Sequence, residues 1–287
     1  MTLIRLLVVG MFTMPTLLLA QTIQKPLDLV EWRFSGNRFQ CLMETPLKFD
    51  GHARIQVQSG KEPELLIETF QRPAAFDSAW LSVNQQVWRI NAQVERWLDG
   101  DSAGEYGVRF YDAQTIKSLL NQMEKGAWAQ VSVLDKQTGK PISWDIPAVN
   151  FSHPMQEMKL CMANLLPMSY SQAKDNQFYF NSNATELAKS DKRVLDDLVQ
   201  YISWDSSLTT ILIDGHTDDQ GHALSNIELS RQRANQVRNY LVSQGVNGKK
   251  IQVRAHGQRY PQVNHSDAQT RHKNRRVQVR LVQGGAS

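Results

Sequence analysis

The densest group of reactive side chains is the stretch Asp214-Gly215-His216-Thr217-Asp218-Asp219, and Arg233 follows 15 residues after Asp218. At this separation the Asp218 carboxylate and the Arg233 guanidinium do not neutralise each other along one helix face, so they can flank one cleft. Such a pair suits a zwitterion, because Asp218 can bind an ammonium group while Arg233 grips a carboxylate with a bidentate pair. The two residues therefore predict a binding site for a molecule that carries both charges.

The elements around this pair follow from hydrophobic periodicity. Residues 208–215 alternate around two isoleucines, which predicts a strand that ends at Gly215. A helix is predicted over residues 226–244, with Gly245 as its stop. The start of that helix would add free backbone N–H groups and a partial positive charge beside the polar loop. The loop and the helix should together position Asp218 and Arg233.

The rest of the C-terminal region alternates strands and helices. Residues 178–180 predict a short strand, and Ser190 is the expected N-cap of a helix that buries Leu195 and Leu198. Further strands are expected from Ile251 and around residues 277–281. The order β-α-β-α-β-β predicts an α/β sandwich with parallel strands joined by right-handed crossovers.

Several residues of this region carry a resemblance to a known family. They are Gly215-His216-Thr217-Asp218, Asn226, Leu229-Ser230-Arg231-Gln232-Arg233-Ala234 and Asn274-Arg275-Arg276-Val277, and their spacing resembles the signature of the OmpA-like peptidoglycan-binding domain. The resemblance implies that Asp218 and Arg233 hold the two ends of the meso-diaminopimelate side chain of a peptidoglycan stem peptide. It also implies that Thr217, Asn226, Leu229 and Arg276 line the same pocket. The family's first strand often ends in acidic residues, whereas this chain has Asn181-Ser182-Asn183, so no contact is carried over to that edge.

The N-terminal half has a different pattern. Alternation or apolar runs predict strands at residues 54–58, 65–70, 87–92, 108–111 and 127–134, and one helix is expected around residues 116–123, ending at Gly126. Six tryptophans fall in this half, at positions 32, 80, 88, 97, 128 and 144. We interpret them as the filling of a β core in preference to an aromatic platform for carbohydrate. This half contains no spacing typical of a catalytic or metal site.

Length, composition and charge agree with this division. The chain has 287 residues, 41% hydrophobic and 21% charged, which argues against disorder, collagen-like repeats and a polytopic membrane protein. Arg5 followed by an apolar run to Ala20 is typical of a cleaved signal peptide, so we expect an exported protein with no stable membrane insertion. We expect a β-rich partner-binding domain over 21–166 and the peptidoglycan-binding domain over 167–287. The net charge of +4 is uneven: 15 basic and 17 acidic residues give −2 in the first domain, and 16 and 11 give +5 in the second.

Export changes the interpretation of the two cysteines. In an oxidising compartment two isolated thiols are paired more often than free, so we expect a disulfide between Cys41, in a strand-like run, and Cys161, in a helical run. The alternative is two unrelated buried thiols.

Two segments, Phe39-Gln40-Cys41-Leu42 and Cys161-Met162-Ala163-Asn164-Leu165-Leu166, lie around the two cysteines. Together with the cleaved signal and a β-rich domain that has a cysteine near each end, they make the whole mature chain resemble the MotY family of sodium-driven flagellar motor proteins. Related families with this C-terminal domain need a membrane helix or an acylated cysteine. The resemblance implies a periplasmic protein at the flagellum basal body and cell wall, with a MotX-like partner and stator proteins as its neighbours. The alternative within this class is a generic cell-wall anchor unrelated to the flagellum.

Three other classes of function are weaker. A metal site is the first, since carboxylates and histidines crowd at Asp214, His216, Asp218, Asp219 and His222. His216 and His222 lack the i, i+4 spacing of a zinc-binding pair on a helix. We expect His216 instead to be a hydrogen-bonded histidine beside the pocket. We therefore expect neither a metal nor a cofactor.

The second class is a cell-wall peptide hydrolase, because Ser225 and Ser230 lie near those histidines in sequence. There is no GxSxG elbow and no Cys–His pair with a base, so we expect no catalytic residues. The third class is nucleic-acid binding by the basic run 249–280, but Tyr260 is its only aromatic residue. A solvated basic face that favours anionic stem peptides explains the run better, and we expect no nucleic-acid partner.

Overall fold

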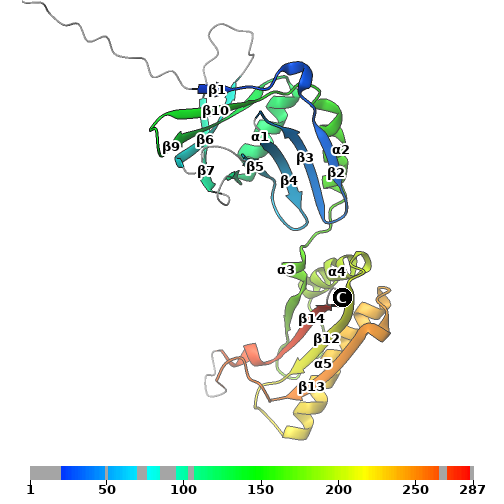
Figure 1. The fold of residues 1–287 in the computed structure, drawn as a ribbon. Coiled ribbons are helices and arrows are strands. Elements are labelled where there is room, and N and C mark those ends of the chain that lie inside the picture. Colours follow the sequence, from blue (N-terminus) through cyan, green and yellow to red (C-terminus); the bar gives the residue numbers. More distant parts are fainter. Residues whose placement is uncertain are drawn as a thin grey trace, which may run out of the picture. The chain divides into compact units, whose positions relative to one another are not determined.

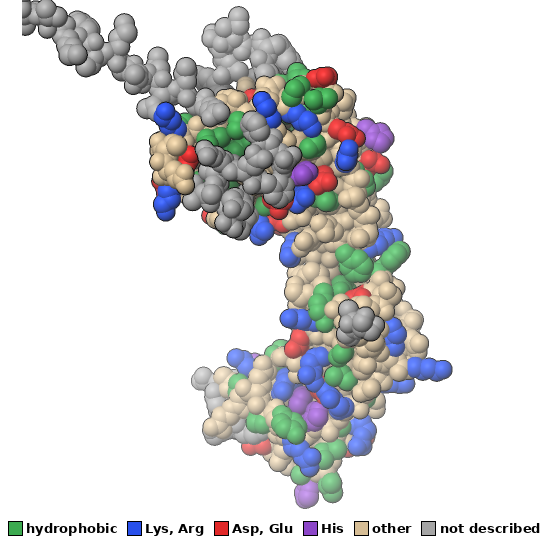
Figure 2. Space-filling model, viewed as in Figure 1, with side chains coloured by type: hydrophobic (Ala, Val, Ile, Leu, Met, Phe, Trp, Pro, Cys, Tyr) green, Lys and Arg blue, Asp and Glu red, His purple; other side chains and the backbone are tan. Residues whose placement is uncertain are grey.

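The computed structural model describes residues 21–48, 51–69, 76–84, 95–102, 107–264 and 270–284. Figure 1 shows its ribbon and Figure 2 the side-chain types on its surface. The expected signal segment 1–20 and the expected strand 87–92 lie outside the described residues. Contacts divide the chain into two compact units, of which one holds Met1–Glu31, Thr45–Ala53 and Leu65–Phe151, and the other Trp32–Glu44, Arg54–Glu64 and Ser152–Ser287.

The N-terminal region is mainly β, as expected, and is built on a ten-stranded sheet with the order β1-β10-β9-β6-β7-β8-β5-β4-β3-β2. The strands are β1 (Gln21–Ile23), β2 (Arg33–Gly36), β3 (Gln40–Pro46), β4 (His52–Gln58), β5 (Glu64–Glu68), β6 (Phe76–Asn84), β7 (Glu95–Ser102), β8 (Gly107–Phe110), β9 (Trp128–Asp135) and β10 (Pro141–Ile146). The short η1 (Leu27–Leu29) follows β1. Strand β1 pairs with β10 in parallel, and β9 pairs with both β10 and β6 in antiparallel register.

Helix α1 (Ala113–Glu124) confirms the helix expected in this half. Its N-cap is Asp112, whose carboxylate accepts the Thr115 N–H, and Gly126 follows the helix with φ +93°, a conformation that glycine adopts without strain. The helix buries one apolar face, made of Ile116, Leu119, Leu120 and Met123. Among the tryptophans, Trp32, Trp128 and Trp144 are buried in the core, which confirms the core interpretation for these three.

A disulfide joins Cys41 to Cys161, with their Cα atoms 5.9 Å apart, and confirms the expected pairing. It connects β3 to α2 (Ser152–Ala163), and the two cysteines are 120 residues apart in sequence. Cys41 is fully buried.

The C-terminal region combines helices with a four-stranded sheet. After the short α3 (Tyr170–Ala173), the elements follow as β11 (Asp175–Tyr179), α4 (Lys189–Trp204), β12 (Leu208–His216), α5 (Ala223–Ser243), η2 (Gly248–Lys250), β13 (Ile251–Gly257), η3 (Arg271–Asn274) and β14 (Arg276–Gln283). The sheet order is β11-β14-β12-β13. Only β12 and β13 pair in parallel, and β14 pairs with β11 and β12 in antiparallel register. Strand β14 lies between β11 and β12 and is antiparallel to both, so β11, β12 and β13 all run in the same direction, as expected, and β14 runs against them.

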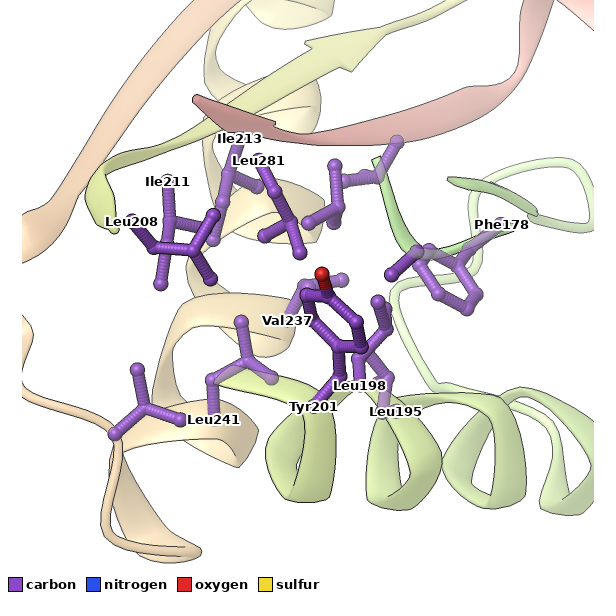
Figure 3. Packing of buried hydrophobic residues seen from close by; sticks show 14 of the residues in the cluster. Phe178, Leu195, Leu198, Tyr201, Leu208, Ile211, Ile213, Val237, Leu241 and Leu281 are labelled. Carbon is purple, nitrogen blue, oxygen red and sulfur yellow. The ribbon is translucent and has the colours of Figure 1, made fainter. Parts of the chain in front are cut away.

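One face of this sheet packs on α4 and α5. Figure 3 shows Ile211, Ile213 and Leu281 of the sheet facing Leu198 of α4 and Val237 of α5. All five are buried, with exposed fractions of 4% or less, and their apolar burial supplies the main stabilisation of this layer.

The helix starts differ from the sequence expectation. Helix α4 begins at Lys189 with Ala188 at its N-cap position, so the expectation that Ser190 caps it was wrong. Ser190 lies in the first turn, and the cap position has no side-chain hydrogen bond. Helix α5 begins at Ala223, earlier than expected, while Gly245 follows its end with φ +96°.

Candidate functional site

Arg233 of α5 is completely buried, which is exceptional for an arginine. Its Nε donates to the Ala184 carbonyl at 2.8 Å, its Nη2 to the Asn181 carbonyl at 3.0 Å, and its Nη1 to the His216 carbonyl at 3.5 Å. Burial, and to a lesser extent the nearby Arg275 guanidinium, lowers the pKa of Arg233 to about 10. The side chain is therefore still a cation at neutral pH, and it holds the segment between β11 and α4 against the end of β12.

Asp218 lies directly beyond β12 and is 6% exposed. Its Oδ2 accepts a hydrogen bond from Arg275 Nη1 at 3.0 Å, and Arg275 Nε donates to the Phe180 carbonyl at 3.1 Å. The Asp218 charge also favours the protonated form of Arg233. Asp218, Arg233 and Arg275 thus form one cluster of a carboxylate and two guanidinium groups, in which Asp218 and Arg233 are buried and Arg275 is partly exposed.

Sequence reasoning missed Arg275 as a member of this cluster. Arg275 belongs to the motif Asn274-Arg275-Arg276, so the sequence did indicate an arginine near the site. It did not show which of the two adjacent arginines contacts Asp218. Arg275 precedes β14, whereas Arg276 is its first residue.

Thr217 directly precedes Asp218, Asn226 bonds to the Asp218 backbone, and both side chains are buried. Asn226 Nδ2 donates to the Gln220 carbonyl at 3.0 Å and to the Asp218 carbonyl at 3.4 Å, and these bonds fold the loop over the start of α5. Thr217 Oγ1 is shielded from solvent and has no hydrogen-bond partner among the described residues. Leu229 is half-buried on α5.

A close approach of β12 to α5 positions these side chains. A Cβ atom at Gly215 would overlap with the Ser230 backbone oxygen, so only glycine allows this distance. Ser230 Oγ in turn accepts the Gly257 N–H at 3.1 Å, which ties β13 to the same helix. The glycine and serine of the motif therefore serve packing, and they bring Arg233 next to the loop.

The alternation of β14 sets the direction of the Arg276 side chain. Val277 and Val279 of β14 point into the core beneath the helices, so Arg276 points to the other face of the sheet. Its Nη2 donates to the Tyr260 carbonyl at 3.3 Å, and its register neighbour on β11 is Tyr179. Its place in the binding pocket remains a prediction.

His216 shares this second sheet face. Its Nδ1 donates to the Arg259 carbonyl at 3.2 Å, and its ring stacks on His256 with centroids 4.8 Å apart. Burial, helped by the positive charge of Arg276, lowers the pKa of His216 to about 4. The ring is neutral at pH 7.

Four of the residues considered for a metal, Asp214, His216, Asp218 and Asp219, are engaged in other contacts. The Asp214 carboxylate accepts hydrogen bonds from Arg254 Nε at 2.6 Å, Arg280 Nη2 at 2.9 Å and His256 Nε2 at 2.7 Å. Within the described ranges, no group of three or more His, Cys, Asp or Glu side chains is arranged to hold a metal ion.

Comparison with known proteins defines the class of this site. Residues 179–275 match the model of the OmpA family. Over 103 residues the chain is 32% identical to the peptidoglycan-associated lipoprotein of Pseudomonas aeruginosa, covering 36% of this chain and 60% of that protein. The crystal structure of the peptidoglycan-associated lipoprotein from Burkholderia pseudomallei is 25% identical, covers 37% of this chain and 89% of that one, and superposes with a TM-score of 0.36. The C-terminal region is an OmpA-like domain.

The N-terminal region defines the family of the whole chain. Residues 23–167 match the model of the MotY N-terminal domain, and because this match spans half of the chain, the chain belongs to that family. It is 27% identical over 255 residues to the sodium-type flagellar protein MotY of Vibrio parahaemolyticus, covering 88% of this chain and 87% of that protein. None of the helices in the described part of the chain has the length and apolar character needed to cross a membrane.

Proposed function

We propose that this protein fastens a flagellar motor to the cell wall. Its OmpA-like domain binds peptidoglycan, and its N-terminal domain binds the basal body, a MotX-like partner and stator proteins. The observation that carries the proposal is the cluster of buried Asp218 and Arg233 with Arg275 in an OmpA-family segment of a MotY-family chain. The proposed location is the periplasm, after removal of residues 1–20.

The charges of the cluster match a diaminopimelate end group. In this proposal the Asp218 carboxylate binds the ammonium group and the Arg233 guanidinium binds the carboxylate, while Thr217 Oγ1 gains the hydrogen-bond partner it lacks among the described residues. Asn226 and Leu229 complete the pocket from α5, and Arg276 remains a proposed contributor.

The hydrogen bonds of Arg233 add a condition to this mechanism. Three of its five N–H donors already bond the carbonyls of Ala184, His216 and Asn181, and the side chain is completely buried, so a ligand carboxylate can reach the remaining donors only after a covering group moves. We expect the segment between β11 and α4, which Arg233 holds through two of these bonds, to shift when the stem peptide binds. Arg275 supports this rearrangement, since it keeps a second positive charge beside Asp218 and Arg233.

Two alternatives were left open by the sequence. A wall anchor unrelated to the flagellum would use the same site, and the MotY-family N-terminal domain favours the motor. A cell-wall peptide hydrolase finds no support, because the similar proteins named above are a flagellar protein and peptidoglycan-associated lipoproteins.

Co-sedimentation of the mature protein with purified peptidoglycan tests the site. Asp218→Asn keeps the shape of the side chain and removes its charge, and Arg233→Lys keeps the charge and removes the planar fork. We expect each variant to bind at least about tenfold more weakly, as is usual for loss of a buried charged contact. Free meso-diaminopimelate should compete with the wild type.

The matched control is Arg231→Ala, two residues away on the same helix, where the side chain is half exposed and pairs with Glu228. It should bind like the wild type. Circular dichroism checks that each variant is folded, and folded Asp218→Asn and Arg233→Lys proteins that sediment normally would rule out the proposed site. For the motor assignment, deleting the gene should stop swimming while filaments still form; unimpaired swimming would favour the generic anchor.

A further inference from the structure

The four-stranded sheet has a second face that α4 and α5 do not cover. Because side chains alternate along a strand, the residues between the core positions of each strand point to this face. The register aligns them in rows across the sheet. We call this surface the open face, and its side chains are Asp175, Gln177 and Tyr179 of β11, Arg276, Gln278 and Arg280 of β14, Leu212, Asp214 and His216 of β12, and Gln252, Arg254 and His256 of β13.

The centre of the open face is the Asp214 carboxylate, whose side chain is only 3% exposed. It holds two guanidinium groups at once, since Arg254 and Arg280 both reach its Oδ2, at 2.6 and 2.9 Å. These contacts keep the pKa of Asp214 far below its usual range. One buried negative charge therefore fixes two positive charges from the strands on either side.

Asp214 holds the two guanidinium groups from the sheet side, while their other side is accessible to solvent. The side chains of Arg254 and Arg280 are 41% and 42% exposed, although each is tied to the buried Asp214. A guanidinium has five N–H donors, and Asp214 occupies only one or two on each arginine. The arginines therefore offer preorganised donors to an anion, and binding costs little side-chain entropy.

A third arginine adds positive charge beneath the surface. Arg276 is 7% exposed, and its Nε and Nη1 have no hydrogen-bond partner among the described residues. Burial of this poorly compensated cation lowers its pKa. An anion bound on the open face would offset the desolvation of Arg276 through space.

The open face also carries exposed aromatic groups at one end. Tyr179 is 46% exposed, and Tyr260, directly after β13, is 70% exposed with its ring edge against His256. Figure 2 shows basic (Lys or Arg), histidine and hydrophobic side chains together on the C-terminal region. Exposed arginine and tyrosine on a rigid sheet are the composition typical of protein interfaces.

We propose that the open face binds an acidic surface of a partner protein, with Arg254 and Arg280 gripping its carboxylates and Tyr179 and Tyr260 supplying the apolar contact. The arginine forks match carboxylates bidentately. A membrane surface fits less well, because membrane-binding surfaces insert apolar side chains, and among the described residues of these four strands the one strongly exposed aliphatic side chain is Val282 of β14. The proposal goes beyond peptidoglycan binding, since Arg254 and Arg280 lie on the sheet face opposite to α5 and Arg233 and are not among the residues proposed for the peptidoglycan pocket.

Binding of a fluorescent poly-L-glutamate peptide to the full mature chain tests the proposal by anisotropy. Arg254→Ala with Arg280→Ala should weaken binding about tenfold, typical of losing close charge pairs. The matched control, Lys192→Ala with Arg193→Ala, removes the same charge from exposed positions on α4 and should change binding less than about twofold. Asp214→Asn leaves the two arginines uncompensated and should strengthen binding, a gain that misfolding would not produce.

Three outcomes would overturn the proposal. An equal loss in the α4 control would mean that net charge alone attracts the peptide. Weaker binding by folded Asp214→Asn would remove the assigned role of the arginine pair. Binding to vesicles of phosphatidylcholine with phosphatidylglycerol, in the absence of peptide binding, would make the face a lipid surface. The Arg254→Ala, Arg280→Ala protein should still co-sediment normally with peptidoglycan. A failure of the open-face proposal can therefore be distinguished from a failure of the proposed function.

Discussion

The buried neutral His216 should make the C-terminal domain sensitive to mild acid. Its pKa is about 4 in the folded protein and 6.5 in the unfolded chain, because burial and Arg276 disfavour the charged ring. Between these values the unfolded state binds a proton that the native state does not, so stability falls as the pH falls from 6.5 to 4. From pH 7 to pH 4.5 the loss is about 2.4 kcal/mol, which corresponds to roughly 60-fold in the opening equilibrium.

Hydrogen exchange of peptides that cover β12 measures this loss, after correction for intrinsic rates. The comparison variant is His216→Asn, whose side-chain amide can replace the Nδ1 donor to the Arg259 carbonyl and does not titrate. The wild-type protection should drop about 60-fold between the two pH values and that of the variant much less. Carboxylates whose pKa is lowered in the folded protein, such as Asp214, change the stability mainly at pH values below this range. An equal drop in both proteins would refute the assignment to His216.

Two further perturbations test the packing. Thiol labelling of the denatured protein, without a reducing agent, should find Cys41 and Cys161 unreactive, and two reactive thiols would contradict the disulfide. Replacing both cysteines by alanine should lower the free energy of unfolding by about 2–5 kcal/mol. Gly215→Ala should cost about 3 kcal/mol or more in a urea titration, because its Cβ would overlap with the Ser230 backbone; Gly248→Ala, with its nearest atoms 3.6 Å away, is the control, and equal costs would contradict the close approach.

Local patterns were sufficient for much of the fold. The alternation of residues 54–58 predicted β4, and the helical spacing around Leu119 with Gly126 predicted α1, because both depend on near neighbours in sequence. Helix starts were less predictable. Ser190 has the chemistry of an N-cap, yet α4 begins one residue earlier, since a cap position depends on how the helix meets the rest of the domain.

Local patterns also could not predict which strands pair or which residues form the charged cluster. The sequence could not show that β14 inserts between β11 and β12, because pairing joins residues far apart in the chain. For the same reason it could not separate two adjacent arginines. Arg275 reaches Asp218, whereas Arg276 turns to the opposite sheet face.

Composition, expected compartment and motif spacing were enough to predict the division into a β-rich and an OmpA-like region, the disulfide, and opposite charges at Asp218 and Arg233. The full burial of Arg233 with its donors on backbone carbonyls, and the two arginines that Asp214 holds from neighbouring strands, became visible only in the folded chain. Burial and hydrogen-bond geometry arise when distant segments pack together, so no local pattern encodes them.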